Sequence, residues 1–164
     1  MQVKRILVPV DFSAASLSAL DEAIDLSRSL DAKLTAMFVL APLHYPSTIE
    51  FMGNAVGLGL IVDEQRKWAK KEMANLVARL AKRGVKCDAL LEHGPPQERI
   101  VETAKRIHAD LIVIGTHGRK GLSHVVLGSV AERVVRTAPC PVLTVHRTAK
   151  QRRVSHRAPR KMVA

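Results

Sequence analysis

The chain has 164 residues, the length of one ordinary domain, which is enough to bury a sizeable core. Apolar residues make up 47% of it and aromatic residues only 3%, so the core must be aliphatic, which suits a parallel sheet covered by helices. Two cysteines are too few for a disulfide framework. The apolar run at residues 6–10 is too short for a signal peptide, so a cytoplasmic location is expected.

The formal net charge of +11 is concentrated near the end of the chain. Residues 147–164 contain seven basic residues and no acid. We therefore expect two parts, a folded domain over residues 1–146 and a basic tail over residues 147–164. Three interpretations of the tail stay open: a solubilising end, an arm that contacts nucleic acid or an anionic membrane, and a segment that folds back onto bound phosphates.

The first quarter of the chain predicts a strand, a helix and a second strand. Residues 5–10 form an apolar run that is typical of a buried strand. A helix is expected over residues 13–30, because apolar residues recur at helical spacing and Ser13 is a suitable N-cap. The second strand is expected over residues 33–40.

The middle of the chain predicts an insertion, a long helix and a third strand. Residues 41–60 hold several prolines and glycines, yet they are apolar for a loop, so part of them is expected to pack or to form a short helix. A helix is expected over residues 62–83, and Gly84 is expected to end it. The third strand is expected over residues 85–91.

The last part of the chain repeats the alternation of helix and strand. A helix is expected to begin at Pro96, a strand to span residues 111–114, a helix residues 129–137, and a final strand residues 141–145. Alternation at this spacing indicates right-handed crossovers, and hence an α/β fold with an open parallel sheet and helices on both faces.

The end of the first strand carries a candidate ligand residue. Open parallel sheets bind ligands at the carboxyl ends of their strands, at the point where the strand order reverses. With the first strand in the centre and the fourth beside it, Asp11 faces Gly115 across that point. Asp11 is therefore a candidate ribose ligand; the alternative is that it caps the helix that follows.

A glycine-bearing loop lies between the fourth strand and the next helix. It reads Gly115-Thr116-His117-Gly118, and after nine intervening residues Gly128-Ser129 opens the helix. Glycines let the backbone approach an anion, and a helix start offers N–H groups, so this loop predicts a phosphate site. The alternative is that its glycines only serve turns. The basic side chains of the loop either neutralise phosphates or form a solvated surface; they are His117, Arg119, Lys120 and His124.

Several catalytic signatures are absent from the sequence. It has no G-x-x-x-x-G-K-[ST] phosphate loop and no G-x-S-x-G nucleophile elbow. No pair of nucleophile and base stands out either. These absences favour a site that holds a nucleotide over one that performs chemistry.

Four segments, in order along residues 4–146, carry a family resemblance. They are Ile6-Leu7-Val8-Pro9-Val10-Asp11-Phe12-Ser13, His93-Gly94-x-Pro96, the glycine pattern of residues 115–132, and Ala138-Pro139-Cys140-Pro141-Val142-Leu143. Together they resemble the universal stress protein family, and in particular its UspA-like, ATP-binding branch.

This resemblance implies a fold, a ligand and a set of site residues. The implied fold is an open five-stranded parallel sheet in the order 3-2-1-4-5, Rossmann-like and similar to the adenine nucleotide alpha hydrolases. The implied ligand is ATP, alone or with Mg²⁺. Asp11 would accept from the ribose or adenine side, and the Val39 backbone would meet adenine. The full set of implied binding residues is Pro9, Val10, Asp11, Val39, Gly115, Thr116, His117, Gly118, Arg119, Gly128, Ser129 and Val130.

The expected function is that of a nucleotide-dependent regulatory or stress-adaptation module, with at most weak ATP hydrolysis. Two alternatives stay open: a slow Mg²⁺-dependent ATPase, and a nucleotide-independent interaction protein that uses its dimer surface or its tail. The resemblance also implies a homodimer. Its contact would be the short, uncharged last strand, which consists of Pro141, Val142, Leu143, Thr144 and Val145.

Overall fold

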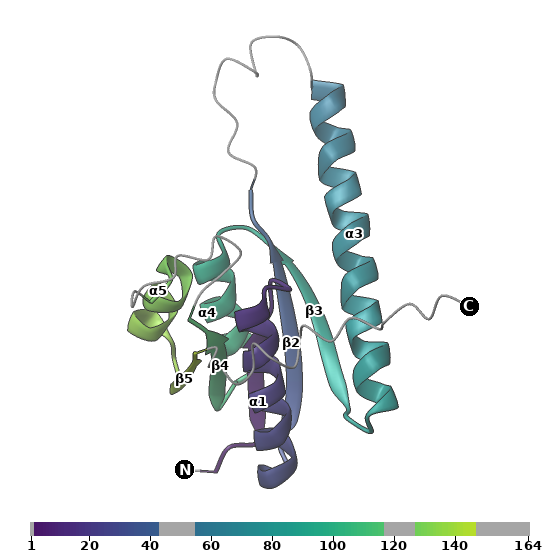
Figure 1. Ribbon diagram of the computed structural model, residues 1–164. Coiled ribbons are helices and arrows are strands. Elements are labelled where there is room, and N and C mark those ends of the chain that lie inside the picture. Colours follow the sequence, from purple (N-terminus) through teal and green to yellow (C-terminus); the bar gives the residue numbers. More distant parts are fainter. Residues whose placement is uncertain (1, 43–54, 117–126, 147–164) are drawn as a thin grey trace, which may run out of the picture.

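Five parallel strands form one sheet in the order β3-β2-β1-β4-β5 (Figure 1). The computed structural model describes residues 2–42, 55–116 and 127–146. Its strands are β1 (Arg5–Pro9), β2 (Lys33–Leu40), β3 (Cys87–His93), β4 (Leu111–Gly115) and β5 (Val142–Val145). Its helices are α1 (Ala14–Leu30), α3 (Ala55–Lys82), α4 (Pro96–Arg106) and α5 (Ser129–Thr137). The expected fold class and strand order are confirmed.

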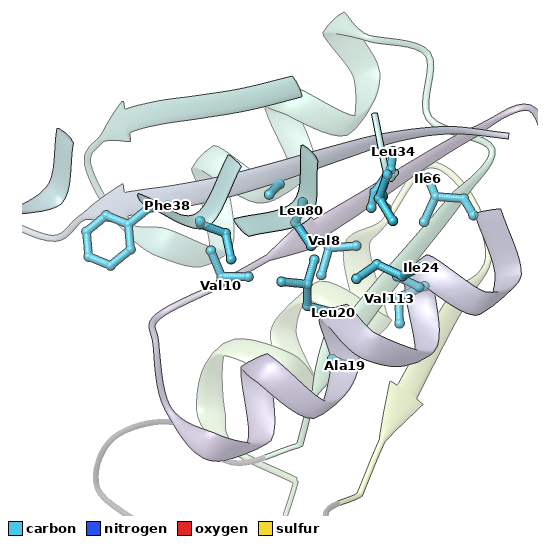
Figure 2. Close-up of a cluster of buried hydrophobic side chains, with 14 of the residues drawn as sticks. Ile6, Val8, Val10, Ala19, Leu20, Ile24, Leu34, Phe38, Leu80 and Val113 are labelled. Carbon is cyan, nitrogen blue, oxygen red and sulfur yellow. The ribbon is translucent and has the colours of Figure 1, made fainter. Parts of the chain in front are cut away.

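Helices cover both faces of the sheet. α1 and α3 pack on one face, and α4 and α5 pack on the other (Figure 1). The side chains of successive β1 residues point to alternate faces of the sheet. Ile6 and Val8 belong to the cluster drawn in Figure 2, and Leu7 belongs to the cluster on the opposite face. Because both faces are buried, the central strands are continuous apolar runs rather than alternating ones.

The strand order reverses at β1. On one side β1 pairs with β2, from Arg5 opposite Lys33 to Pro9 opposite Met37. On the other side it pairs with β4, with Ile6 opposite Leu111. The crossover through α1 leads from β1 to β2 on one side, and the crossover through α4 leads from β3 back to β4 on the other side. The carboxyl ends of β1 and β4 therefore lie side by side at this reversal.

The long helix α3 begins earlier than the sequence pattern predicts. It starts at Ala55, inside the segment expected to be an insertion, and it runs to Lys82. Glycines in that segment argue for a loop, since each costs about 1 kcal/mol in a helix relative to alanine, but the helix continues through Gly59. Figure 1 shows the first part of α3 extending past the carboxyl ends of the strands.

The strand β3 begins two residues later than expected, at Cys87. The reason is the turn that ends α3, in which Gly84 has a φ of 70° and the Val85 N–H donates to the Leu80 carbonyl at 3.0 Å. Val85 is thus held in the helix-ending turn rather than in the sheet. In the described part of the chain, no helix is both long and apolar enough to cross a membrane.

Candidate functional site

The turn after β1 is organised by side-chain hydrogen bonds. The Asp11 Oδ1 accepts from the Ser13 N–H at 2.9 Å, and the Asp11 N–H donates to Ser16 Oγ at 3.2 Å. Ser13 is the N-cap of α1, as predicted, and its side chain accepts from the Ser16 N–H at 3.2 Å. Asp11 therefore braces the turn that precedes the cap, and it is not itself the cap.

Phe12 is the central residue of this turn and has an unusual backbone. Its φ of 62° lies in the left-handed region, which is uncommon for a bulky residue. Its ring lies 5.4 Å from that of Phe38 and 5.7 Å from that of Trp68, measured between ring centroids. Sequence reasoning missed this arrangement, because no local signal marks a phenylalanine for positive φ.

Val39 lies one residue before the end of β2, and its neighbours determine the direction of its backbone groups. The Met37 carbonyl accepts from the Val10 N–H at 2.8 Å, on the side of β1. The Leu40 carbonyl accepts from the Gly94 N–H at 3.0 Å, on the side of β3. Backbone groups of successive strand residues point to alternate sides, so those of Val39 point toward β1, as those of Met37 do. They are directed past the point where β1 has ended.

Gly115 ends β4 in close contact with the first turn of α1. A Cβ atom at this position would lie 2.7 Å from the Ala15 carbonyl carbon and 2.9 Å from the Ser16 nitrogen. Since these are backbone atoms, they cannot move aside as a flexible side chain would. The structure thus places Gly115 next to the Asp11 turn, as expected, and gives this glycine a packing role that sequence reasoning did not foresee.

Thr116 joins the ends of three elements, and its side chain is fully buried. Its N–H donates to the Val145 carbonyl at 3.1 Å, and its Oγ1 lies 3.0 Å from His146 Nδ1. Its carbonyl accepts from the Gly128 N–H at 2.7 Å. Thr116 therefore fixes the end of β4 against β5 and against the start of α5. The contact with His146 had no signal in the sequence, because it joins distant parts of the chain.

The start of α5 presents backbone N–H groups at the same edge of the sheet. Gly128 is the N-cap position, and no side-chain hydrogen bond caps it in the described structure. Ser129 and Val130 follow in the first turn, where N–H groups lack partners within the helix and the helix dipole is positive. The remaining predicted residues, His117, Gly118 and Arg119, lie outside the described residues.

The two thiols are poorly suited to nucleophilic chemistry. Burial raises the pKa of the Cys87 thiol to about 11, and burial also raises the pKa of Cys140. Both thiols are therefore protonated near neutral pH, and the thiol form is a weak nucleophile. Both side chains pack against the hydrophobic clusters of the sheet, so they contribute to its packing.

The fold and this edge define a class of protein: a parallel α/β domain with an acidic turn after its central strand and an open helix start beside it. The sequence model described as the universal stress protein family matches residues 2–146. The chain belongs to the universal stress protein family.

Known relatives span almost the whole chain. A universal stress protein of Methanocaldococcus jannaschii is 38% identical over 150 residues, which cover 90% of this chain and 85% of that relative. The structure of UspA from Lactobacillus plantarum has a TM-score of 0.73 at 30% identity, covering 88% of this chain and 99% of the other. A universal stress protein in complex with cAMP has a TM-score of 0.58 at 26% identity, covering 89% and 98% of the two chains.

Proposed function

We propose that this universal stress protein binds an adenine nucleotide, ATP, at the carboxyl ends of β1 and β4, and that it acts as a nucleotide-dependent regulatory module. The observation that carries the proposal is the 2.7 Å hydrogen bond from the Gly128 N–H to the Thr116 carbonyl. It holds the open start of α5 beside the end of β4, where Gly115 contacts the first turn of α1 at Ala15 and Ser16, and the Ser16 side chain accepts from the Asp11 N–H. The related structure in complex with cAMP supports the choice of an adenine nucleotide.

The site residues divide into three groups by the part of the nucleotide that they suit. The backbone groups of Val39 would bind the adenine edge, beyond Pro9 at the end of β1 and Val10 directly after it. Asp11 would accept hydrogen bonds from the ribose hydroxyls, which its charge makes strong. The N–H groups of Ser129 and Val130 would receive the phosphates, because a helix start favours anions. Gly128, whose own N–H donates to the Thr116 carbonyl, would let the phosphates approach the backbone closely.

The loop residues complete the proposed site. Gly115 and Thr116 would shape the phosphate end through the packing and hydrogen bonds described above. His117, Gly118 and Arg119 are proposed to contact the phosphates on the strength of the sequence resemblance alone. Mg²⁺ is commonly held through phosphate oxygens with few protein ligands, so an ATP–Mg²⁺ complex suits the same set of donors.

A slow Mg²⁺-dependent ATPase is the alternative, and retention of the nucleotide distinguishes it from a binding module. We expect ATP to bind in a one-to-one ratio in calorimetry and to be recovered intact after long incubation with Mg²⁺. Release of ADP at a constant rate would favour the enzyme. Purified protein that carries no nucleotide and gives no heat with ATP, ADP or AMP would favour the nucleotide-independent interaction protein and would contradict the proposal.

A further inference from the structure

Three aromatic side chains meet beside the Asp11 turn, in a chain that has only three Phe, one Trp and one Tyr. Phe12 comes from the turn, Phe38 from β2 and Trp68 from α3. The ring centroids of Phe38 and Trp68 are 5.8 Å apart, and both rings lie within 6 Å of Phe12 at tilted or edge-on angles. In Figure 2, Phe38 and Ile6 lie at opposite ends of the buried cluster.

The backbone of Phe12 needs such support. A φ of 62° is strained for a residue with a large side chain, and a strained residue persists only where its surroundings over-determine it. The two ring contacts supply that constraint, since a return to negative φ would swing the ring of Phe12 away from Phe38 and Trp68. The aromatic cluster therefore holds the turn in its left-handed form.

The same turn decides where the Asp11 carboxylate points. The hydrogen bond from the Ser13 N–H to Asp11 Oδ1 spans Phe12, so it depends on the backbone of that residue. We infer that Phe12 is a positioning residue for Asp11, and that Trp68 of α3 acts through Phe12 to set the affinity of the nucleotide site. This inference rests on the proposed function, in which Asp11 binds the ribose.

A purely structural role makes a different prediction for the same residues. Phe38 is 5% exposed and belongs to the core, whereas Trp68 is 42% exposed. If the cluster only stabilised the fold, substitutions in it would lower the melting temperature and leave nucleotide affinity unchanged. If the cluster positions Asp11, the same substitutions also raise the dissociation constant for the nucleotide.

The test compares Phe12→Ala and Trp68→Ala with variants that keep a ring, Phe12→Tyr and Trp68→Phe. We expect each alanine variant to raise the dissociation constant for ATP about tenfold, the loss of one well-placed hydrogen bond to a charged group. The ring-keeping variants should restore most of the affinity. Exchange of the Ser13 amide with deuterium, a readout that needs no ligand, should be faster in both alanine variants.

The matched control is Leu80→Ala. Leu80 is 2% exposed in the same core and lies about 18 Å further along α3, at 1.5 Å per residue, from Trp68. The Leu80→Ala substitution should lower the melting temperature without raising the dissociation constant for ATP.

The possible failures are distinguishable. Wild-type protein that binds ATP, with alanine variants that only lose stability, overturns this inference alone. Wild-type protein that binds no adenine nucleotide overturns the proposed function and the inference together.

Discussion

Asp11 accepts a hydrogen bond from the Ser13 N–H, which stabilises the turn after β1. A substitution that keeps this hydrogen bond can separate the structural role of Asp11 from its proposed role in binding. We expect Asp11→Ala to weaken ATP binding by about 1–3 kcal/mol, through loss of charged hydrogen bonds to the ribose, and to lower stability by freeing the Ser13 N–H. Asp11→Asn keeps an oxygen acceptor for that N–H, so it should spare stability and still weaken binding. Melting temperature and dissociation constant, measured together, check both variants. A loss of stability with unchanged affinity would mean that Asp11 serves only the turn.

Substitution by alanine is expected to have opposite effects on stability at Gly115 and at Gly59. Gly115→Ala should destabilise the protein by about 1–3 kcal/mol, because the new methyl group would overlap backbone atoms of α1. Gly59→Ala should stabilise it by up to about 1 kcal/mol, because nothing lies within 4 Å of that Cβ in the helix α3. Chemical denaturation measures both. Equal effects of the two substitutions would contradict the close packing of β4 on α1.

The roles of some single residues could be predicted from the sequence, and those of others could not. Ser13 was predictable as an N-cap, because capping depends on residue type and on neighbours in the chain. The contacts of Gly115 with α1 and of Thr116 with His146 were not predictable, since they depend on how distant segments pack. The positive φ of Phe12 was not predictable either, because the rings that hold it come from β2 and α3.

At the scale of elements, Asp110 ties the start of β1 to the start of β4. Its Oδ2 accepts from the N–H groups of Lys4 and Arg5 at 2.9 and 2.8 Å. The hydrogen bond from Lys4, followed by the bond and charge of Arg5, lowers the pKa of the Asp110 carboxyl below its ordinary 3.8.

A carboxyl with a lowered pKa stabilises the fold at pH values above its ordinary pKa, and this stabilisation is lost as the pH falls through the lowered value. We therefore expect the melting temperature to fall less steeply at acid pH in Asp110→Asn than in the wild type, which a series from neutral pH to about pH 2 can measure. Parallel curves for the two proteins would contradict this role of Asp110.

A substitution at the start of α5 tests the proposed phosphate site directly. Gly128 has a φ of −58° and a ψ of 147°, which any residue can adopt, so Gly128→Val should leave the fold intact. The branched side chain would occupy the space that the phosphates need, and we expect ATP binding to be lost in calorimetry. Thr137→Val, at the other end of the same helix, is the control and should bind normally. Unchanged ATP affinity in Gly128→Val would show that the helix start does not receive the phosphates.

The elements themselves were largely predictable, because apolar runs and helical spacing are properties of short stretches of chain. α5 and β2 have the predicted bounds. The start of α3 was missed, since glycine content argued for a loop there and only the structure shows that the helix continues.

At the scale of the whole molecule, β5 forms an edge of the sheet and Leu143 on it is 40% exposed. We expect a homodimer in which β5 pairs with β5 of a second copy, because an uncovered apolar edge favours association. Leu143→Lys should then give a monomer in sedimentation experiments, whereas Leu60→Lys on the distant α3 should not. A wild-type protein that is monomeric at micromolar concentration, without aggregating, would count against this dimer.

The contact between His146 and Thr116 has a practical consequence for handling the protein. The last described residue lies beside the carboxyl ends of the strands, and β1 starts at the opposite, amino edge of the sheet. A purification tag appended after the last residue would follow a segment that begins next to the proposed nucleotide site. A tag on the first residue would leave from the far edge, so affinities are best measured with the tag at that end.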